Sequence, residues 1–229
     1  RHNNRKSGRR MNLKHLTIGQ FSYFKFEIAI IITLSVLKFT VMDWLNMRAF
    51  FIIGVCFFWL SYIYYRHRID KSVLAKWGIS RNNLLKSLFL LLPFVVLTII
   101  LSIIYGKNTG TSVKIWHLLP VLALYPVWGT FQQFIVIALI VQNLYHRKTS
   151  NFRKLFLVFI GALFFSLIHS PDFLLMSFSF FMEILFILVF LKDKNLWALG
   201  LAHGLVATFF IYFVQGRDLW IELFSWFLN

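Results

Sequence analysis

Two histidines and two adjacent glutamines stand out in a sequence whose apolar runs otherwise carry little chemistry. His169 and His203 lie in two of these runs, and Gln132 and Gln133 lie together in a third. Imidazole exchanges protons near neutral pH, whereas an amide only donates and accepts hydrogen bonds. Polar side chains at bilayer depth are costly, so each is a candidate for function or for a hydrogen bond between helices.

Glu183 is a carboxylate deep within the apolar run at 173–191. A turn centred on Asp193 joins this run to the one that carries His203. In an antiparallel helix hairpin, positions 183 and 203 lie at the same depth, because each is ten residues from Asp193. Two hypotheses follow. Glu183 pairs with His203 and supplies a catalytic base, or it is neutral and either bonded to a backbone or Ser/Thr group or turned to a protein-packed face.

His169 ends a short segment that begins at Phe165 and is followed by Pro171. Phe165 and His169 share one helix face through their i, i+4 spacing. Pro171 stops the helix, so we expect His169 at its C-terminal end, where the helix dipole favours a cation. The plainer alternative is a histidine held at the membrane interface by water and carbonyl groups.

His203 lies between Gly200 and Gly204, which form a small-xxx-small ridge. Such a ridge lets another helix backbone approach closely, so we predict that His203 faces a neighbouring helix rather than lipid. Adjacent helical residues such as Gln132 and Gln133 point about 100° apart, so at most one of them faces a given cavity squarely. Packing for His203 and hydrogen bonds between helices for the glutamines remain the alternatives.

Together these segments resemble the CPBP family, the membrane proteins related to type II CAAX prenyl endopeptidases. The family pattern is Glu-Glu with an Arg four residues later, then Phe-xxx-His, then His-xxx-Asn or a related motif. Phe165 to His169 matches the second motif, and residues 194–203 look like the segment leading into the third. The resemblance covers about 116–210. It implies an intramembrane endopeptidase in which a first-motif glutamate activates water and histidines position that water or stabilise the oxyanion.

The first motif departs from the family pattern. Gln132 and Gln133 stand in place of the glutamate pair, Ile137 replaces the arginine, and Ala207 stands where the third motif often has Asn. An amide has no basic form, so it cannot take a proton from water. Loss of a general base typically lowers a rate by about 10²–10⁴-fold.

Two functions therefore remain open. The first is a CPBP-type intramembrane endopeptidase of weak or no activity, with a catalytic site made of His169, His203, Gln132, Gln133 and Glu183. The second is an inactive family member that acts as a membrane scaffold or as a regulator of a partner protein. A transporter is less well supported, because nothing resembles paired inverted repeats.

No cofactor is expected. A catalytic zinc site usually takes three protein ligands, and His169 and His203 supply two, with glutamine a poor third. The expected partners are membrane lipid and a membrane-embedded peptide or partner protein. Nucleic acid is not expected, because the basic residues fall in short clusters between apolar runs rather than on one folded face.

The composition places these residues in a lipid-embedded chain. Of 229 residues, 59% are apolar and 14% are charged, whereas a soluble domain has about a quarter of its residues charged. We predict an all-α, polytopic transmembrane helix bundle of about seven spans, with an eighth at 220–228 left open. The domain covers 27–229 and follows a basic tail at 1–26. The runs long enough to span lie at 27–46, 49–65, 85–105, 116–145, 155–169, 173–191 and 197–214.

The distribution of Lys and Arg predicts the orientation of the chain. Nineteen of them fall in the tail at 1–26 and in the connections at 66–86, 146–154 and 192–194. The opposite side carries four, at Arg48, Lys107, Lys114 and Arg217. The positive-inside rule then predicts a multi-pass protein of the cell membrane with a cytoplasmic N-terminus. We expect residues 66–84 to form an interfacial amphipathic helix or a solvated basic loop.

Overall fold

The computed structural model describes residues 23–145 and 150–228, and its regular elements within these ranges are all helical. The all-α prediction is therefore confirmed. Residues 23–37 form a helix that continues into the π-helical segment η1 (Lys38–Trp44). The longer helices that follow are α2 (Arg48–Ile69), α4 (Leu84–Asn108), α5 (Ile115–Gln133), α7 (Asn151–Leu167), α8 (Phe173–Asp193) and α9 (Leu196–Phe209). The shorter elements are α3 (Val73–Lys76), η2 (Phe134–Val141), α6 (Gln142–Leu144), η3 (Phe210–Val214) and α10 (Leu219–Leu228).

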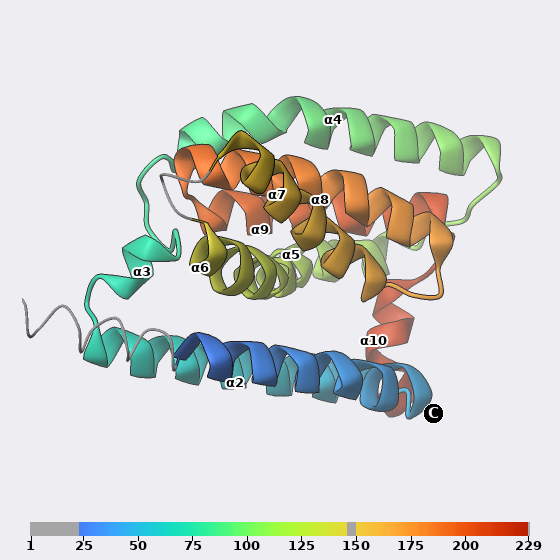
Figure 1. Cartoon of the computed structure of the whole chain (residues 1–229). Helices are drawn as coiled ribbons and strands as arrows, with labels where there is room; N and C mark the ends of the chain where they lie inside the picture. Colours follow the sequence, from blue (N-terminus) through green and yellow to red (C-terminus); the bar gives the residue numbers. More distant parts are fainter. Residues whose placement is uncertain (1–22, 146–149, 229) are drawn as a thin grey trace, which may run out of the picture.

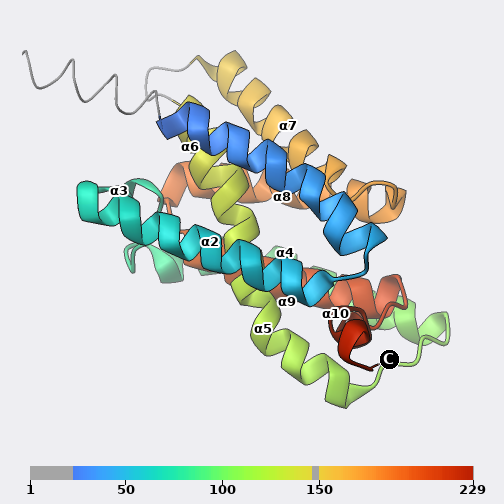
Figure 2. The same ribbon diagram turned by 90° about the horizontal axis from the view of Figure 1, so that it is seen from below.

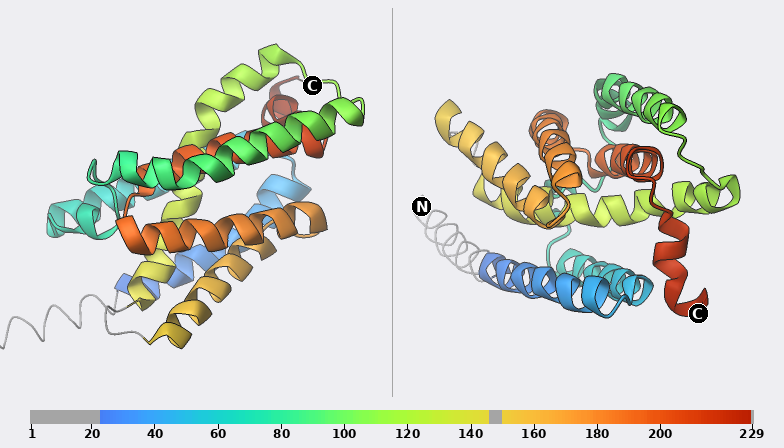
Figure 3. Two further views of the ribbon diagram at one scale, coloured as in Figure 1. Left: turned by 90° about the horizontal axis from the view of Figure 1, so that it is seen from above. Right: turned by 90° about the vertical axis from the view of Figure 1, so that its right-hand side faces the viewer.

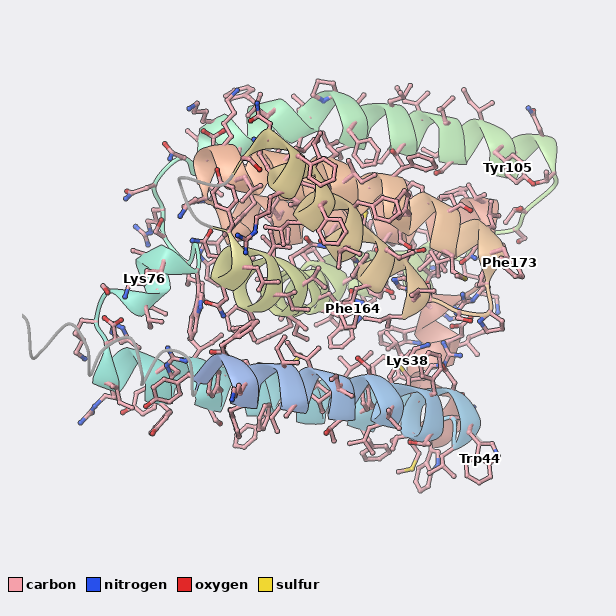
Figure 4. All side chains as sticks on the ribbon, viewed as in Figure 1. Lys38, Trp44, Lys76, Tyr105, Phe164 and Phe173 are labelled. Atoms are coloured by element: carbon pink, nitrogen blue, oxygen red, sulfur yellow. The ribbon has the colours of Figure 1, made fainter. Side chains whose placement is uncertain are left out.

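The long helices run side by side in a layered bundle (Figure 1). The helix of residues 23–44 and α2 make up one face (Figures 2 and 3), and α5 crosses between this pair and the layer of α4, α8 and α9. The connections at 70–83 and 194–195 lie at one end of the bundle, and those at 109–114 and 168–172 lie at the other. In Figure 4, Lys76 lies at the first end, and Trp44 and Tyr105 lie at the second.

Five stretches in the described part of the chain are long and apolar enough to cross a membrane, which supports a multi-pass membrane protein. The predicted count of seven is not confirmed. The helix of residues 23–44 is not one of the five, and α7 has 17 residues, fewer than the roughly 20 that a span needs. The five stretches are Arg48–Ile69, Leu84–Asn108, Ile115–Leu144, Phe173–Asp193 and Leu196–Val214.

Three predicted basic segments either lie partly outside the described residues or differ from expectation. Most of the predicted tail and part of the 146–154 connection fall outside the described ranges, and residues 23–26 are already helical. The prediction of a single amphipathic helix over residues 66–84 is wrong. Asp70 adopts an extended conformation that ends α2, and the chain then forms only the four-residue α3 before Gly78 adopts a φ of 74°. Val73 and Trp77 are buried in the protein rather than turned to lipid.

The glycine ridge of α9 packs directly on α5, as the sequence predicts. A Cβ atom built on Gly200 would lie 1.8 Å from Thr130 Oγ1, and one on Gly204 would lie 2.4 Å from the Pro126 nitrogen. Only a residue without a side chain permits this approach. His203 lies between the two glycines and is 3% exposed, so this contact turns its imidazole into the protein.

Candidate functional site

Gln132 and Gln133 point into different surroundings, as their neighbouring positions on one helix require. Gln132 lines a cavity of about 430 Å³ that His169 also lines. Gln133 is fully buried between α5, α8 and α9. The two amides therefore belong to separate parts of the site, and each has to be considered with its own neighbours.

The buried amide of Gln133 bridges Glu183 and His203. Its Nε2 lies 2.8 Å from Glu183 Oε2 and 3.1 Å from His203 Nδ1. An amide nitrogen carries two hydrogens, so it can donate to both neighbours at once. Nδ1 of His203 is then an acceptor, and the proton of the neutral ring lies on Nε2. Glu183 and Gln133 are 0% exposed, which makes this a closed three-helix network.

The predicted equal depth of Glu183 and His203 agrees with this arrangement, but no direct hydrogen bond joins them among the described residues. Gln133 enters from α5 and occupies the space between the two side chains. The prediction of equal depth rests on the antiparallel pair α8 and α9 alone. It therefore contains no information about Gln133, which belongs to α5. A backbone or hydroxyl partner for Glu183 is not found, because its partner is the Gln133 amide. The side chain does lie on a protein-packed face, since it is 0% exposed.

Phe165 connects the buried network to the cavity. Its ring centroid lies 5.1 Å from that of His169 and 5.6 Å from that of His203, with steep interplanar angles of 76° and 82°. Helix α7 ends at Leu167, so His169 lies just beyond it, where its backbone N–H donates to Ser166 at 2.9 Å. The second motif thus places one aromatic ring between the two histidines.

The cavity that contains Gln132 and His169 is rimmed by charged side chains. Lys38 pairs with Asp43 at 2.7 Å, and Arg217 pairs with Glu222 at 2.7 Å and with Asp172 at 3.8 Å. Each carboxylate that lines the cavity is therefore held in an ion pair. A partial signal for these residues is present in the sequence, since Lys38 interrupts an apolar run, but nothing in the pattern connects them with His169. Gln133, Glu183 and His203 do not line this cavity.

A metal site finds no support in the arrangement of donors. Among residues 23–145 and 150–228, no group of three or more His, Cys, Asp or Glu side chains could hold a metal ion. His203 directs Nδ1 at the Gln133 amide, and His169 faces a separate cavity. The site as described offers hydrogen-bonding and proton-exchange chemistry.

Comparison with known families identifies part of the chain. A model of the type II CAAX prenyl endopeptidase Rce1-like family matches residues 113–209. Residues 113–209 are Rce1-like. The match confirms the resemblance to the CPBP family, and the Rce1-like region covers less than half of the chain. It begins just before α5 and ends with α9. It contains the five site residues predicted from the sequence, whereas Lys38 and Arg217 at the cavity rim lie outside it. No curated protein and no solved structure matches the chain.

Proposed function

We propose that this chain is a CAAX-endopeptidase-like membrane protein that binds a membrane-associated peptide in the cavity beside Gln132 and His169. The observation that carries the proposal is that these two residues, both within the Rce1-like region, line one cavity. An amide and an imidazole can hold a peptide carbonyl and a water molecule by hydrogen bonds. Hydrolysis in this cavity is weak or absent, because Gln132 cannot accept the proton of that water.

His169 is the base that remains at the cavity. A neutral imidazole can take a proton from water. His169 is half-buried at the cavity wall, so a water molecule bound in the cavity could reach it. The carboxylates around the cavity are held by Lys38 and Arg217, which leaves them poorly suited as bases. Residual hydrolysis therefore depends on His169.

An apolar groove supports a substrate with a hydrocarbon part. This groove, of about 470 Å³, lies between α2, α5 and α10. It shares Ile52, Tyr125, Trp128 and Leu223 with the cavity that contains His169, so the two spaces adjoin. A membrane-associated peptide could place an apolar group in the groove and its backbone beside Gln132. Such a substrate would enter from the bilayer rather than from water.

The second candidate function is an inactive scaffold or regulator that holds the same kind of peptide without cutting it. One observation favours it specifically: the carboxylate of Glu183 is fully buried and does not line the cavity. Glu183 is thus a poor replacement for the missing general base. Both candidates use one cavity, so they differ in turnover and not in where the peptide binds.

Restoring a carboxylate at the cavity distinguishes the two candidates. The full chain in liposomes is given a farnesylated CAAX peptide with a quenched fluorophore, and hydrolysis and binding are measured separately. For a weak enzyme, we expect Gln132→Glu to raise the hydrolysis rate by about 10²–10⁴-fold, because it supplies the base. His169→Ala should then remove this gain. Gln142→Glu is the matched control, because it makes the same change on the same helical stretch but lines another cavity.

Each outcome has a distinct meaning. Binding without hydrolysis in both the wild type and Gln132→Glu would favour the scaffold. If binding of the peptide is the same in the wild type and in a Gln132→Leu, His169→Ala double variant, the cavity is not the peptide site and the proposal fails.

A further inference from the structure

The buried half of the site contains a carboxylate that the reaction chemistry above does not use. Glu183 lies on α8 among the buried apolar residues Met182, Phe186 and Ile187, and its polar contact is the Gln133 amide. A carboxyl group at this depth is costly unless it has a defined partner. We propose that Glu183 is a positioning residue that, through Gln133, determines which nitrogen of His203 carries the proton. The relevance of this to hydrolysis rests on the proposed function.

The chemistry of an amide makes this control possible. An amide presents a donor face, its NH₂ group, and an acceptor, its oxygen. Glu183 Oε2 accepts a hydrogen from Gln133 at 2.8 Å, and this contact orients the amide so that the second hydrogen reaches His203 Nδ1 at 3.1 Å. Nδ1 must then be unprotonated. With the acceptor at position 183 removed, the amide can turn and offer its oxygen, which selects the other tautomer.

The surroundings hold the ring of His203 in place. Phe165 packs against it with its centroid 5.6 Å away, and Phe186 does so at 6.5 Å. On a third side, a Cβ atom built on Gly129 would lie 2.9 Å from Cδ2 of the imidazole, so the backbone of α5 closes this side. A ring packed in this way cannot readily reverse its two nitrogens. The contact at Nδ1 therefore determines the tautomer.

The same geometry explains how an amide at position 133 fits its neighbours. Two ionised carboxylates at the 2.8 Å separation of Gln133 and Glu183 would repel strongly, so at most one of the two positions tolerates a charge. Gln133 and Glu183 are thus a matched amide and carboxylate supplied by different helices. Exchanging the two should preserve the pair but reverse its polarity toward His203.

Nuclear magnetic resonance of the full chain, labelled with ¹⁵N-histidine and reconstituted in lipid nanodiscs, tests this proposal without any substrate. The His203 signals are assigned by their loss in His203→Gln. In the wild type, we expect one tautomer, with a pyridine-type Nδ1 and a pyrrole-type Nε2. Glu183→Leu should convert this into a mixture of tautomers. The exchange variant Gln133→Glu, Glu183→Gln should reverse the assignment, because a carboxylate at position 133 can only accept and His203 must donate to it from Nδ1.

Asp70→Asn is the control, because it alters a carboxylate in a separate, exposed ion pair that contributes little to stability. It should leave the His203 signals unchanged. If Glu183→Leu fails to fold, the exchange variant carries the test, since it retains both polar groups. An unchanged tautomer in the folded exchange variant would overturn the proposal. Because the readout is spectroscopic, that failure would be distinct from a failure of peptide binding or hydrolysis at the cavity.

Discussion

The Arg66 guanidinium nitrogen Nη1 of α2 lies 2.8 Å from Glu27 Oε1, and this buried ion pair connects the helix of residues 23–44 to α2. The same Glu27 carboxylate accepts from the Tyr62 hydroxyl at 2.5 Å and from the Asn143 amide at 2.9 Å. The guanidinium of Arg66 also lies 5.4 Å from the ring centroid of Trp77. One carboxylate thus connects three parts of the chain that are far apart in sequence.

Loss of one member of this pair should destabilise the protein strongly. Arg66→Met leaves Glu27 buried without its cation, and such a loss typically costs about 3–5 kcal/mol in the free energy of unfolding. The free energy is measured by denaturant unfolding in detergent. Lys76→Met is the control, since its partner Asp70 is on the surface and exposed pairs contribute less than about 1 kcal/mol. Equal effects of the two variants would contradict the structural role of the Glu27 pair.

The exposed pair of Asp70 and Lys76 should affect stability in a defined pH range. The hydrogen bond from Lys76 lowers the pKa of Asp70 to about 2. A carboxylate whose pKa is lowered on folding stabilises the protein above its unfolded pKa of about 4, and this contribution is lost as the pH falls toward 2. Because the pair is exposed, we expect less than about 1 kcal/mol. Unfolding of wild type and Asp70→Asn should differ slightly at about pH 6 and converge near pH 2. A difference that grows on acidification would refute the assignment.

The close contact of α9 with α5 should not tolerate a methyl group. Gly204→Ala places a Cβ atom 2.4 Å from the Pro126 nitrogen, where backbone rather than a flexible side chain must move. Such overpacking typically costs about 1–3 kcal/mol. Gly54→Ala on α2 has nothing within 4 Å of the new atom, so it should be neutral or stabilising by up to about 1 kcal/mol. Thermal unfolding of both variants compares the two sites, and a Gly204→Ala variant as stable as the wild type would rule out this close helix contact.

The orientation in the membrane remains a prediction that reporter fusions can test. Fusions after Lys76 and after Lys194 should report the cytoplasmic side, because both connections are basic and lie at the same end of the bundle. A fusion after Gly110 should report the opposite side. An external signal after Lys194 would reverse the orientation and transfer the cavity of His169 to the cytoplasmic half.

The helices could be predicted from the sequence because lipid imposes long apolar runs. The glycine ridge predicted that a neighbouring helix approaches α9 closely, but not that this helix is α5. The side-chain partners of the site could not be predicted in the same way. The helical period shows that the side chains of Gln132 and Gln133 point in different directions. Only the packing of the three helices shows that Gln132 is the one that lines the cavity. Glu27 and Arg66 lie in different segments with no shared pattern, so their pairing depends on the tertiary fold. For the same reason, the hypothesis of a Glu183–His203 pair did not include the Gln133 amide that bridges the two side chains.

The contact between Glu183 and Gln133 also restricts how this protein can evolve. Codons for glutamine and glutamate differ only in their first base, so glutamate at either position of the adjacent pair is always within easy mutational reach. At position 132 that change adds a carboxylate to the cavity, which Glu183 does not line. At position 133 it meets the carboxylate of Glu183, so selection would accept it only after, or together with, a change on α8. The two positions are neighbours in the chain, yet a single mutation to glutamate is compatible with the structure only at position 132. At position 133 the same mutation depends on a second change at Glu183.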